Sequence, residues 1–150
     1  MLRLEPLLTA EVTLAPPQEF GPTPLGRRRI IQITGGTFEG ARLRGRVLAG
    51  GADWQVIRPD GVAVLDTRYT LETHDGALIY VQNKGLRCGP PGVMQNLMKG
   101  ETVDPSLYYM RTHPYLETGD PRYDWLNRLV CVGAGERLPS AVRLQFYEVK

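Results

Sequence analysis

Residues 34–54, TGGTFEGARLRGRVLAGGADW, carry six glycines around a short alternating core. In that core Leu43, Gly45 and Val47 alternate with three arginines, which is the period of a β-strand. A glycine inside a strand pattern indicates a bulge, a bend or the close approach of another backbone. The stretch has no metal-ligand spacing, nucleophile elbow or phosphate loop. It therefore predicts bent strands and does not identify a reaction.

The same period of two extends over most of the chain and predicts an all-β protein. Two turn signatures, Pro-Asp-Gly at 59–61 and His-Asp-Gly at 74–76, separate some of the runs. The second turn joins two long runs and predicts a hairpin. The expected strands cover residues 7–14, 29–34, 42–47, 54–58, 62–73, 77–84, 108–117 (interrupted by Pro114), 124–133 and 141–149.

One segment departs from the strand pattern. Pro-Pro-Gly at 90–92 leads into Val-Met-Gln-Asn-Leu-Met and ends at Gly100, which predicts a short helix near 92–100. Eight or nine short strands with one small helix favour a single antiparallel β-barrel over residues 1–150, and a β-sandwich is the alternative. The clustered glycines favour the barrel, because closing a small barrel requires bends and bulges.

Composition narrows the class of protein further. With 18 basic and 16 acidic residues the net charge is +2, too balanced to predict a nucleic-acid partner. No apolar run approaches 18 residues and no secretory signal is visible, so neither a membrane partner nor export is expected. Cys88 and Cys131 are then expected as two reduced thiols in a cytoplasmic protein. With only His74 and His113 beside them, no metal site is predicted. The two serines lie in no hydrolase motif.

Several polar residues fall on shared strand faces. Asp66 and Arg68 share one face of the run 62–73, and its other face carries Leu65, Tyr69 and Leu71. Both faces are partly apolar, so alternation does not decide which one lines the barrel. The pair is either part of a site or an ordinary charged pair at the rim.

A second group lies later in the chain. Tyr109 and Arg111 share a strand face, and Tyr123, Trp125 and Asn127 share another. The latter set has the composition of a ligand-binding wall, mostly apolar with one polar anchor. The alternative is core packing with Asn127 bonded to the backbone.

Two carboxylates are candidates for a role in a pocket. Glu117 near the aromatic residues could act as a general acid or base if buried, and is otherwise a loop carboxylate. Asp53 either caps a turn or points into the barrel mouth. The basic run Arg27, Arg28 and Arg29 is interpreted as a solvated strand face, with a phosphate-binding patch as the alternative.

The order of these motifs resembles a known family. It includes ITGGTFEG at 33–40, LRGRV at 43–47, GGADW at 50–54, DTRYTL at 66–71, DGALIYV at 75–81, YYMRTHP at 108–114, ETG at 117–119 and YDWLN at 123–127. Together they resemble the domain of unknown function 3237 family, also called uncharacterised protein family 0311, over Leu4 to Val149. Met110 stands where a Phe is more usual.

The resemblance implies a small, often oligomeric antiparallel β-barrel and no assigned activity. The family's recurrent polar and aromatic positions fall here on Asp53, Arg68, Tyr80, Asn83, Tyr109, Arg111, Glu117, Trp125 and Asn127.

The first functional hypothesis is a pocket inside the barrel that serves a cofactor-independent lyase, isomerase or cyclase acting on an aromatic or enone-type organic acid. Arg68 or Arg111 would hold a carboxylate or oxyanion, and Glu117 or Tyr109 would move a proton. Tyr123 and Trp125 would stack on the ligand, and Asp53, Tyr80, Asn83 and Asn127 would complete the site. The alternatives are a carrier without turnover and a structural oligomer with a filled barrel. The expected partners are a small-molecule ligand and further copies of the chain.

Overall fold

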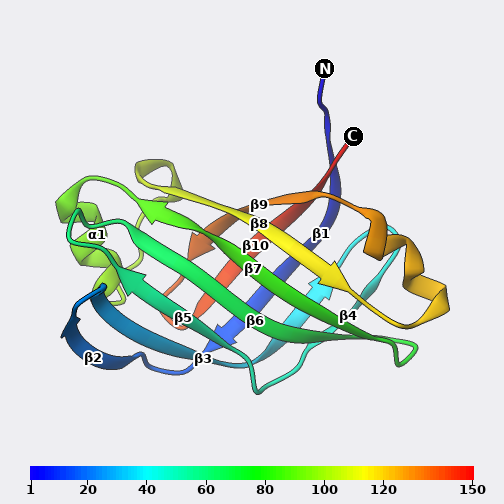
Figure 1. Cartoon of the computed structure of the whole chain (residues 1–150), viewed down its shortest axis with the longest axis horizontal. Coiled ribbons are helices and arrows are strands. Elements are labelled where there is room, and N and C mark those ends of the chain that lie inside the picture. The colour runs from blue at the N-terminus through cyan, green and yellow to red at the C-terminus, as the bar shows by residue number, and fades with distance from the viewer.

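The computed structural model describes all 150 residues and shows a closed antiparallel β-barrel (Figure 1). Its strands are β1 (Leu4–Leu14), β3 (Gly26–Glu39), β4 (Arg44–Val47), β5 (Ala52–Ile57), β6 (Ala63–Thr73), β7 (Leu78–Cys88), β8 (Tyr109–Glu117), β9 (Cys131–Arg137) and β10 (Ala141–Val149). The order β1-β10-β9-β8-β7-β6-β4-β3 closes on itself because β3 also pairs with β1. The predicted barrel is therefore confirmed, and the sandwich is excluded.

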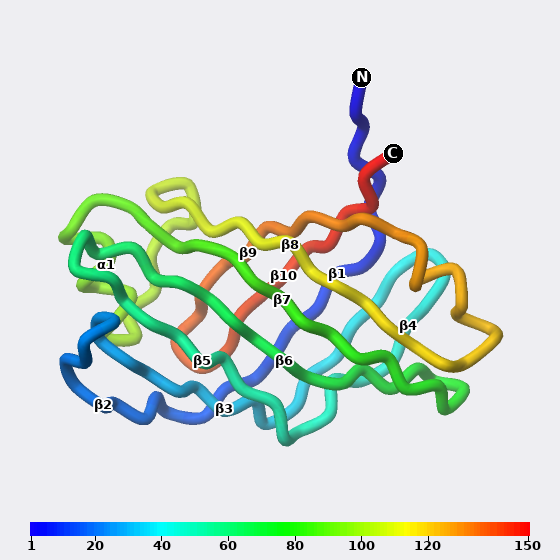
Figure 2. Tube along the Cα trace, in the orientation of Figure 1, coloured from blue at the N-terminus to red at the C-terminus, as the bar shows by residue number.

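Two short strands share one place in the ring. β5 pairs with residues 27–32 of β3 and with the first half of β6. β4 pairs with residues 37–39 of β3 and with residues 71–73 of β6. The barrel thus has eight positions around its circumference, and the trace of Figure 2 shows the chain bending between β4 and β5.

The glycine-rich stretch also bends β3, at residues 35–36, where it pairs with β1. The β1–β3 register shifts between Thr13 and Leu14, opposite Gly35 and Gly36, whose φ angles are +152° and +138°. A Cβ on Gly36 would collide with the carbonyl oxygen of Glu11, so no other residue fits. The predicted structural role of these glycines is confirmed.

Two elements differ from the sequence-based expectation. β2 (Gln18–Thr23) forms a hairpin with β3 outside the ring and had no recognised signal. The expected strand at 124–133 is instead the 3-10 helix η2 (Pro121–Arg128) followed by β9. η2 starts here because the side chain of Asp120 accepts the backbone N–H of Arg122 and a proline occupies the first helical position.

The other features agree with the expected pattern more closely. The helix α1 (Pro91–Met98) occupies the predicted segment, and a short 3-10 turn, η1 (Pro105–Leu107), follows it. The interruption expected at Pro114 is wrong, because β8 continues through this residue, which pairs with Asn83 of β7. None of the three helices has the length and apolar character that crossing a membrane requires.

The interior contains two separate hydrophobic clusters. The larger has 19 buried residues, including Leu71, Ile79 and Phe146, together with Tyr123 and Leu126 of η2. The smaller has seven and joins Met94 and Leu97 of α1 to the barrel wall. Figure 1 shows α1 and η2 at opposite ends of the barrel. The layer between the two clusters is where the barrel interior becomes polar.

Candidate functional site

The polar layer encloses a cavity of about 40 Å³. A water needs roughly 10–15 Å³ of such space, so the cavity has room for about three. It lies inside the ring, because its walls are the inward-facing positions of β1, β3, β5, β6, β7, β8, β9 and β10. Its polar lining consists of Asp53, Gln55, Thr67, Tyr69, Asn83, Arg87, Thr112 and Arg137.

Asp53 is the one carboxylate in this lining. Its Oδ1 accepts the backbone N–H of Asp66 at 3.0 Å, and its Oδ2 accepts Nε2 of Gln55 at 3.1 Å. Burial raises the pKa of Asp53 above its ordinary value, although these hydrogen bonds and the charge of Arg87 act in the opposite direction. The carboxyl group is therefore held in place and binds a proton more readily than an exposed aspartate does.

Three arginines are buried around the same layer. Arg29 pairs with Glu19 at 3.0 Å and donates to Gln55, and Nη1 of Arg137 donates to the backbone carbonyls of Leu138 and Ala141. The sequence-based interpretation of Arg29 as part of a solvated face is wrong, because β3 turns this side chain inward. Because Glu19 pairs with Arg29, the cavity lining itself holds two arginines, Arg87 and Arg137, and one carboxylate, Asp53, which leaves it with excess positive charge.

Arg87 differs from the other two. Its side chain is buried, and its Nε has no hydrogen-bond partner. Burial, together with the nearby charges of Arg137 and Arg29, lowers the pKa of Arg87 to about 10, so it still carries its charge at neutral pH. A buried cation without a full set of partners is costly, and its place in the cavity wall makes Arg87 a candidate for binding a ligand.

Three further polar atoms of the cavity wall are unpartnered. They are the phenol oxygen of Tyr69, Oδ1 of Asn83 and Oγ1 of Thr112. Burial raises the pKa of the Tyr69 phenol, which therefore remains a neutral hydrogen-bond donor. Together with Arg87 and Asp53 they can bind an anionic group, orient it and exchange a proton with it.

Of the residues proposed from the sequence, the structure brings Asp53 and Asn83 to this cavity. Arg87 and Arg137 were missed, although Arg87 shares the face of Asn83 and Gly85 along β7. Once Asn83 is known to point inward, alternation places Arg87 inward as well. The missing information was which face of each strand lines the interior.

Other proposed residues lie on the outer surface of the sheet. Arg68 on β6 is exposed and forms an ion pair with Asp66 at 3.8 Å, and Tyr80 on β7 also faces outward. Tyr109 and Arg111 line a separate groove of about 780 Å³ on the outside of β6, β7, β8 and β9. We call it the outer groove. Neither arginine can hold a ligand inside the barrel from these positions.

Glu117 is also exposed, at the end of β8. Its Oε1 accepts the phenol O–H of Tyr115 at 3.0 Å. The outward face of β8 carries it away from the cavity, so the structure does not support Glu117 as the group that moves a proton there. Tyr109, exposed in the outer groove, is separated from the cavity by the same strand.

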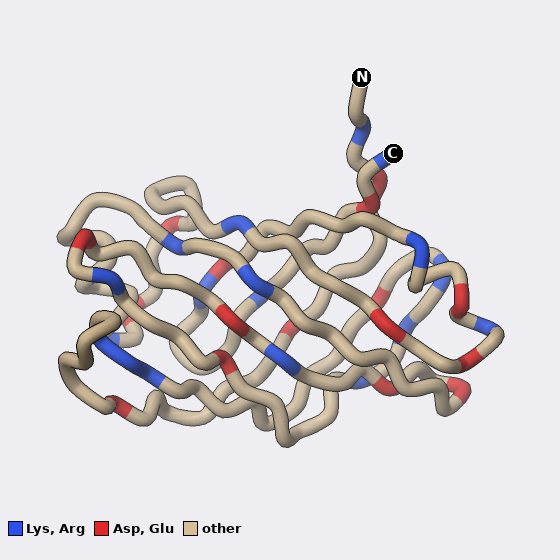
Figure 3. Tube along the Cα trace, in the orientation of Figure 1, with Lys and Arg blue, Asp and Glu red and all other residues tan.

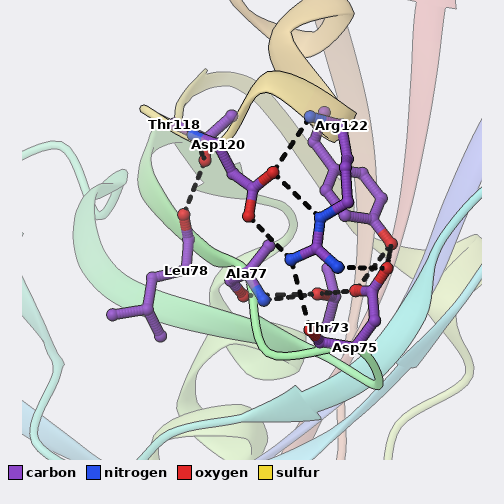
Figure 4. A network of polar contacts seen from close by, with 8 residues as sticks. Thr73, Asp75, Ala77, Leu78, Thr118, Asp120 and Arg122 are labelled. Atoms are coloured by element: carbon purple, nitrogen blue, oxygen red, sulfur yellow. Dashed lines mark hydrogen bonds and ion pairs between the residues drawn. The ribbon is translucent and has the colours of Figure 1, made fainter.

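The predicted aromatic wall is instead the closed end of the barrel. Tyr123 donates to both carboxylate oxygens of Asp75 at 2.9 and 3.0 Å, and Arg122 bridges Asp75 and Asp120 at 3.2 and 2.8 Å (Figure 4). The Arg42 guanidinium lies 3.7 Å from the centre of the Trp125 ring. The contacts of Asp75 attach η2 to the β6–β7 turn, the Arg42 contact attaches it to the β3–β4 connection, and both aromatic rings pack with the larger core cluster.

Asn127 is bonded to the backbone, as the alternative interpretation of the sequence expected. Its Oδ1 accepts the N–H of Thr118 and its Nδ2 donates to the carbonyl of the same residue, both at 2.9 Å. The Asn127 side chain therefore binds both backbone groups of Thr118, just before η2 begins. Across the whole chain, no three His, Cys, Asp or Glu side chains are grouped as a metal site would require.

Comparisons with known proteins agree with the fold and the sequence motifs. A "UPF0311 protein" of Rhodopseudomonas palustris is 45% identical over 124 residues, which are 83% of this chain and 81% of that protein. Another, from Clostridium acetobutylicum, is 38% identical over 149 residues, 99% of this chain and 94% of its own length.

Solved structures show the same barrel. A β-barrel-like protein from Acinetobacter baumannii is 49% identical with a TM-score of 0.87, covering 100% of this chain and 97% of its own. An enzyme from Penicillium herquei has a TM-score of 0.74 at 21% identity, covering 99% and 95%, which shows a shared fold. The sequence profile described as "Protein of unknown function (DUF3237)" matches residues 2–149. The chain therefore belongs to the DUF3237 family.

Proposed function

We propose that this barrel binds a small organic anion in its interior cavity and that Asp53 exchanges a proton with the bound molecule. The reaction class would be a cofactor-independent lyase, isomerase or cyclase. The observation that carries the proposal is Arg87, buried with an unpartnered Nε beside the raised-pKa carboxyl of Asp53. An anionic ligand would give the Nε of Arg87 the hydrogen-bond partner that it lacks and would lie within reach of Asp53.

Electrostatics favours an anion over a neutral ligand. The buried Arg87 and Arg137 lie in the cavity lining, and Asp53 is its one carboxylate, while the buried Arg29 nearby is neutralised by Glu19. A carboxylate, phenolate or enolate oxygen would neutralise this excess, and a guanidinium binds such groups through two parallel hydrogen bonds. Arg87, with its free Nε, is the natural anchor.

Proton transfer requires a group whose pKa lies closer to neutrality than that of an ordinary aspartate. Asp53 meets this requirement through burial, and its two hydrogen bonds fix its orientation. As a base it would remove a proton next to a carbonyl group, and Arg87 would stabilise the oxyanion that develops. Tyr69 and Thr112, whose oxygens are unpartnered, would hold the remaining polar atoms of the ligand.

The cavity is smaller than the roughly 300–1,000 Å³ of typical ligand sites, so binding requires part of its wall to move. The segment that contains α1 is the best candidate. Leu65 and Met110 line the cavity and also belong to the seven-residue cluster that holds Met94 and Leu97 of α1. Displacing this small cluster would enlarge the cavity without disturbing the larger one.

The Penicillium herquei enzyme supports the idea that a barrel of this shape can carry catalysis, although a fold alone does not determine a reaction. The second candidate is a carrier that binds the same anion without turnover. The free thiols of Cys88 and Cys131 suit the cytoplasmic location that we propose for either activity.

The test combines binding with isotope exchange. A panel of aromatic and α,β-unsaturated organic acids is screened by calorimetry against the wild type, Asp53→Asn and Arg87→Met. Arg68→Met, which removes an exposed arginine, is the matched control. A ligand that binds the wild type and the control, and fails to bind Arg87→Met, supports the anion site.

Proton exchange then separates enzyme from carrier. The ligand is incubated in D2O and its deuterium content is followed by NMR. The protein is an enzyme if the wild type incorporates deuterium into the ligand, and if Asp53→Asn still binds the ligand but no longer incorporates deuterium. Binding without incorporation identifies a carrier, and ligand binding that Arg87→Met leaves unchanged contradicts the site itself.

A further inference from the structure

The outer groove has the size and the composition of a small-molecule site. Its volume of about 780 Å³ lies within the roughly 300–1,000 Å³ of typical ligand sites, whereas the interior cavity measures about 40 Å³. Eight of its fifteen lining residues are hydrophobic, and such sites combine a mostly apolar lining with a few polar groups. The groove lies on the opposite side of the barrel wall from the cavity, with Leu65 and Thr112 between the two.

Strand register gathers three basic side chains at the centre of the groove. Lys84 of β7 pairs with His113 of β8, and Arg111 lies two residues before His113 on the same outward face. Positions related in these two ways are about 5–7 Å apart. All three side chains are exposed, and Figure 3 shows basic positions on both strands. The like charges of Lys84 and Arg111 on one sheet face repel each other, and an anion between them would relieve this repulsion.

The two cations of this cluster are not neutralised within the molecule. Neither Lys84 nor Arg111 forms an ion pair. The one carboxylate of the groove, Asp66, forms its ion pair with Arg68 at 3.8 Å, although it is opposite Lys84 in the strand register. Nη1 of Arg111 donates to the backbone carbonyl of Met110. The remaining donors of the guanidinium and the Lys84 ammonium group are therefore free to bind an anion.

A shallow apolar hollow adjoins the cluster on the side of β9. Its floor is formed by Ala134, which pairs with Arg111, and by Val132, and both side chains are small. Tyr147 of β10, which pairs with Val132, and Leu4 of β1 stand at the far edge. A flat ring lying over this floor would contact apolar groups beneath it and an aromatic ring at its edge. An anionic substituent on that ring would point toward Arg111.

We propose that the outer groove is a second ligand site, for an organic phosphate with a flat aromatic body. The phosphate would bind Lys84, Arg111 and His113, and the aromatic body would occupy the hollow over β9. A phosphate is favoured over a carboxylate because it offers three acceptor oxygens and up to two negative charges, which match three donor side chains and two unpaired cations. This site is separate from the interior anion site of the proposed function.

The experiment uses naphthyl phosphate as the probe and measures its binding to the full chain by calorimetry. Inorganic phosphate and naphthol present the head group and the aromatic body separately, and naphthoate has the same body with a single charge. We expect naphthyl phosphate to bind at least tenfold more tightly than each of these three compounds. A naphthoate that binds as tightly as the phosphate ester overturns the choice of a phosphate.

Three variants test the position of the probe. Lys84→Gln and Arg111→Gln each remove one cation, and Ala134→Leu fills the hollow without changing the charge. Each should raise Kd at least tenfold, the loss expected for one charge-assisted hydrogen bond or for a blocked hollow. Arg44→Gln is the matched control, because Arg44 is exposed on β4, outside the groove, and should leave Kd unchanged. Circular dichroism verifies that each variant is folded.

A fourth variant, Arg87→Met, separates the outer groove from the interior cavity. Binding of the probe should be unchanged in Arg87→Met and weakened in Arg111→Gln. The reverse pattern would place the probe inside the barrel and overturn the outer site. A wild type that does not bind naphthyl phosphate at millimolar concentration also overturns it. Neither result bears on proton exchange by Asp53, which the deuterium experiment tests with other ligands.

Discussion

At the scale of single residues, the main feature is an arginine that the fold alone does not require. Arg87 stands buried in a polar layer, and its Nε makes no hydrogen bond in the free protein. A buried polar group without a hydrogen-bond partner costs stability, and an apolar side chain of similar volume does not carry this cost. A side chain that costs stability and faces a cavity is expected where binding depends on it.

Arg87→Met should therefore make the unliganded protein more stable while it abolishes anion binding. We expect a gain of roughly 1–3 kcal/mol in the free energy of unfolding, the usual penalty of one buried unsatisfied donor. For a chain of this size each 1 kcal/mol raises Tm by about 2–4 °C. Calorimetric melting of Arg87→Met beside Arg68→Met measures the difference. A lower Tm for Arg87→Met than for the control would mean that the guanidinium is structural.

Asp53 should impose a pH dependence on proton exchange. Because burial raises its pKa, the acid limb of the deuterium-incorporation rate should lie above the value of about 4 typical of an exposed aspartate. The folded protein also binds this proton more tightly than the unfolded chain. Asp53 therefore favours folding fully below about pH 4, and this contribution is lost as the pH rises through the raised pKa. A rate profile with its acid limb at or below pH 4 would exclude Asp53 as the base.

Only part of the candidate site could be predicted from the sequence. Asp53 and Asn83 were identified, but Arg68 and Arg111 were preferred over Arg87 as anion anchors. The reason is that Leu65 and Val64 are both apolar, so the alternation of β6 did not show which face was inside. Register with neighbouring strands settles that question, and register depends on contacts distant in sequence.

At the scale of elements, η2 is held by side-chain contacts more than by its own sequence preference. Arg122 of η2 pairs with Asp75 of the β6–β7 turn and with Asp120 at the start of η2 itself (Figure 4). The hydrogen bond from Thr73 lowers the pKa of Asp75 most, and that from Arg122 lowers the pKa of Asp120 most. Both carboxylates are thus stabilised in their charged form.

Acid should loosen this end of the barrel first. Carboxylates with lowered pKa values contribute stability above about pH 4, and this contribution is lost as the pH falls through their folded pKa values. The fluorescence of Trp125, measured in a Trp54→Phe background, should shift in that range before circular dichroism reports loss of the strands. The shift should occur at higher pH in Tyr123→Phe, which lacks two hydrogen bonds to Asp75. Simultaneous loss of both signals would contradict a separate loosening of η2.

The elements that the sequence predicted best are those formed by local chemistry. β10 matches its expected limits, and the β6–β7 hairpin follows from the turn at 74–76. η2 was mistaken for a strand because Tyr123, Trp125 and Asn127 alternate with charged and apolar residues over only a few positions. The stronger signal was Asp-Pro at 120–121, a cap followed by a first-turn proline.

At the scale of the whole molecule, closure depends on places where two backbones come too close for a side chain. Gly36→Ala adds a Cβ against the carbonyl of Glu11 at a φ of +138°. We expect a loss of several kcal/mol, of the order reported for severe backbone strain and core overpacking. Gly119→Ala is the control, because nothing lies within 4 Å of its Cβ position. Chemical denaturation compares the two, and equal stabilities would show that the bend at residues 35–36 can relax.

β1 pairs with β3 on one side and with β10 on the other. During synthesis β1 is made before the rest of the ring, and β10 is made after every other strand. Until β10 emerges from the ribosome, β1 and β9 each present an open edge that can pair with another nascent chain. The closed ring therefore leaves the chain prone to aggregation during its own translation. A stop codon placed before β10 should yield insoluble protein. Deletion of Val149 and Lys150 alone should leave the protein soluble.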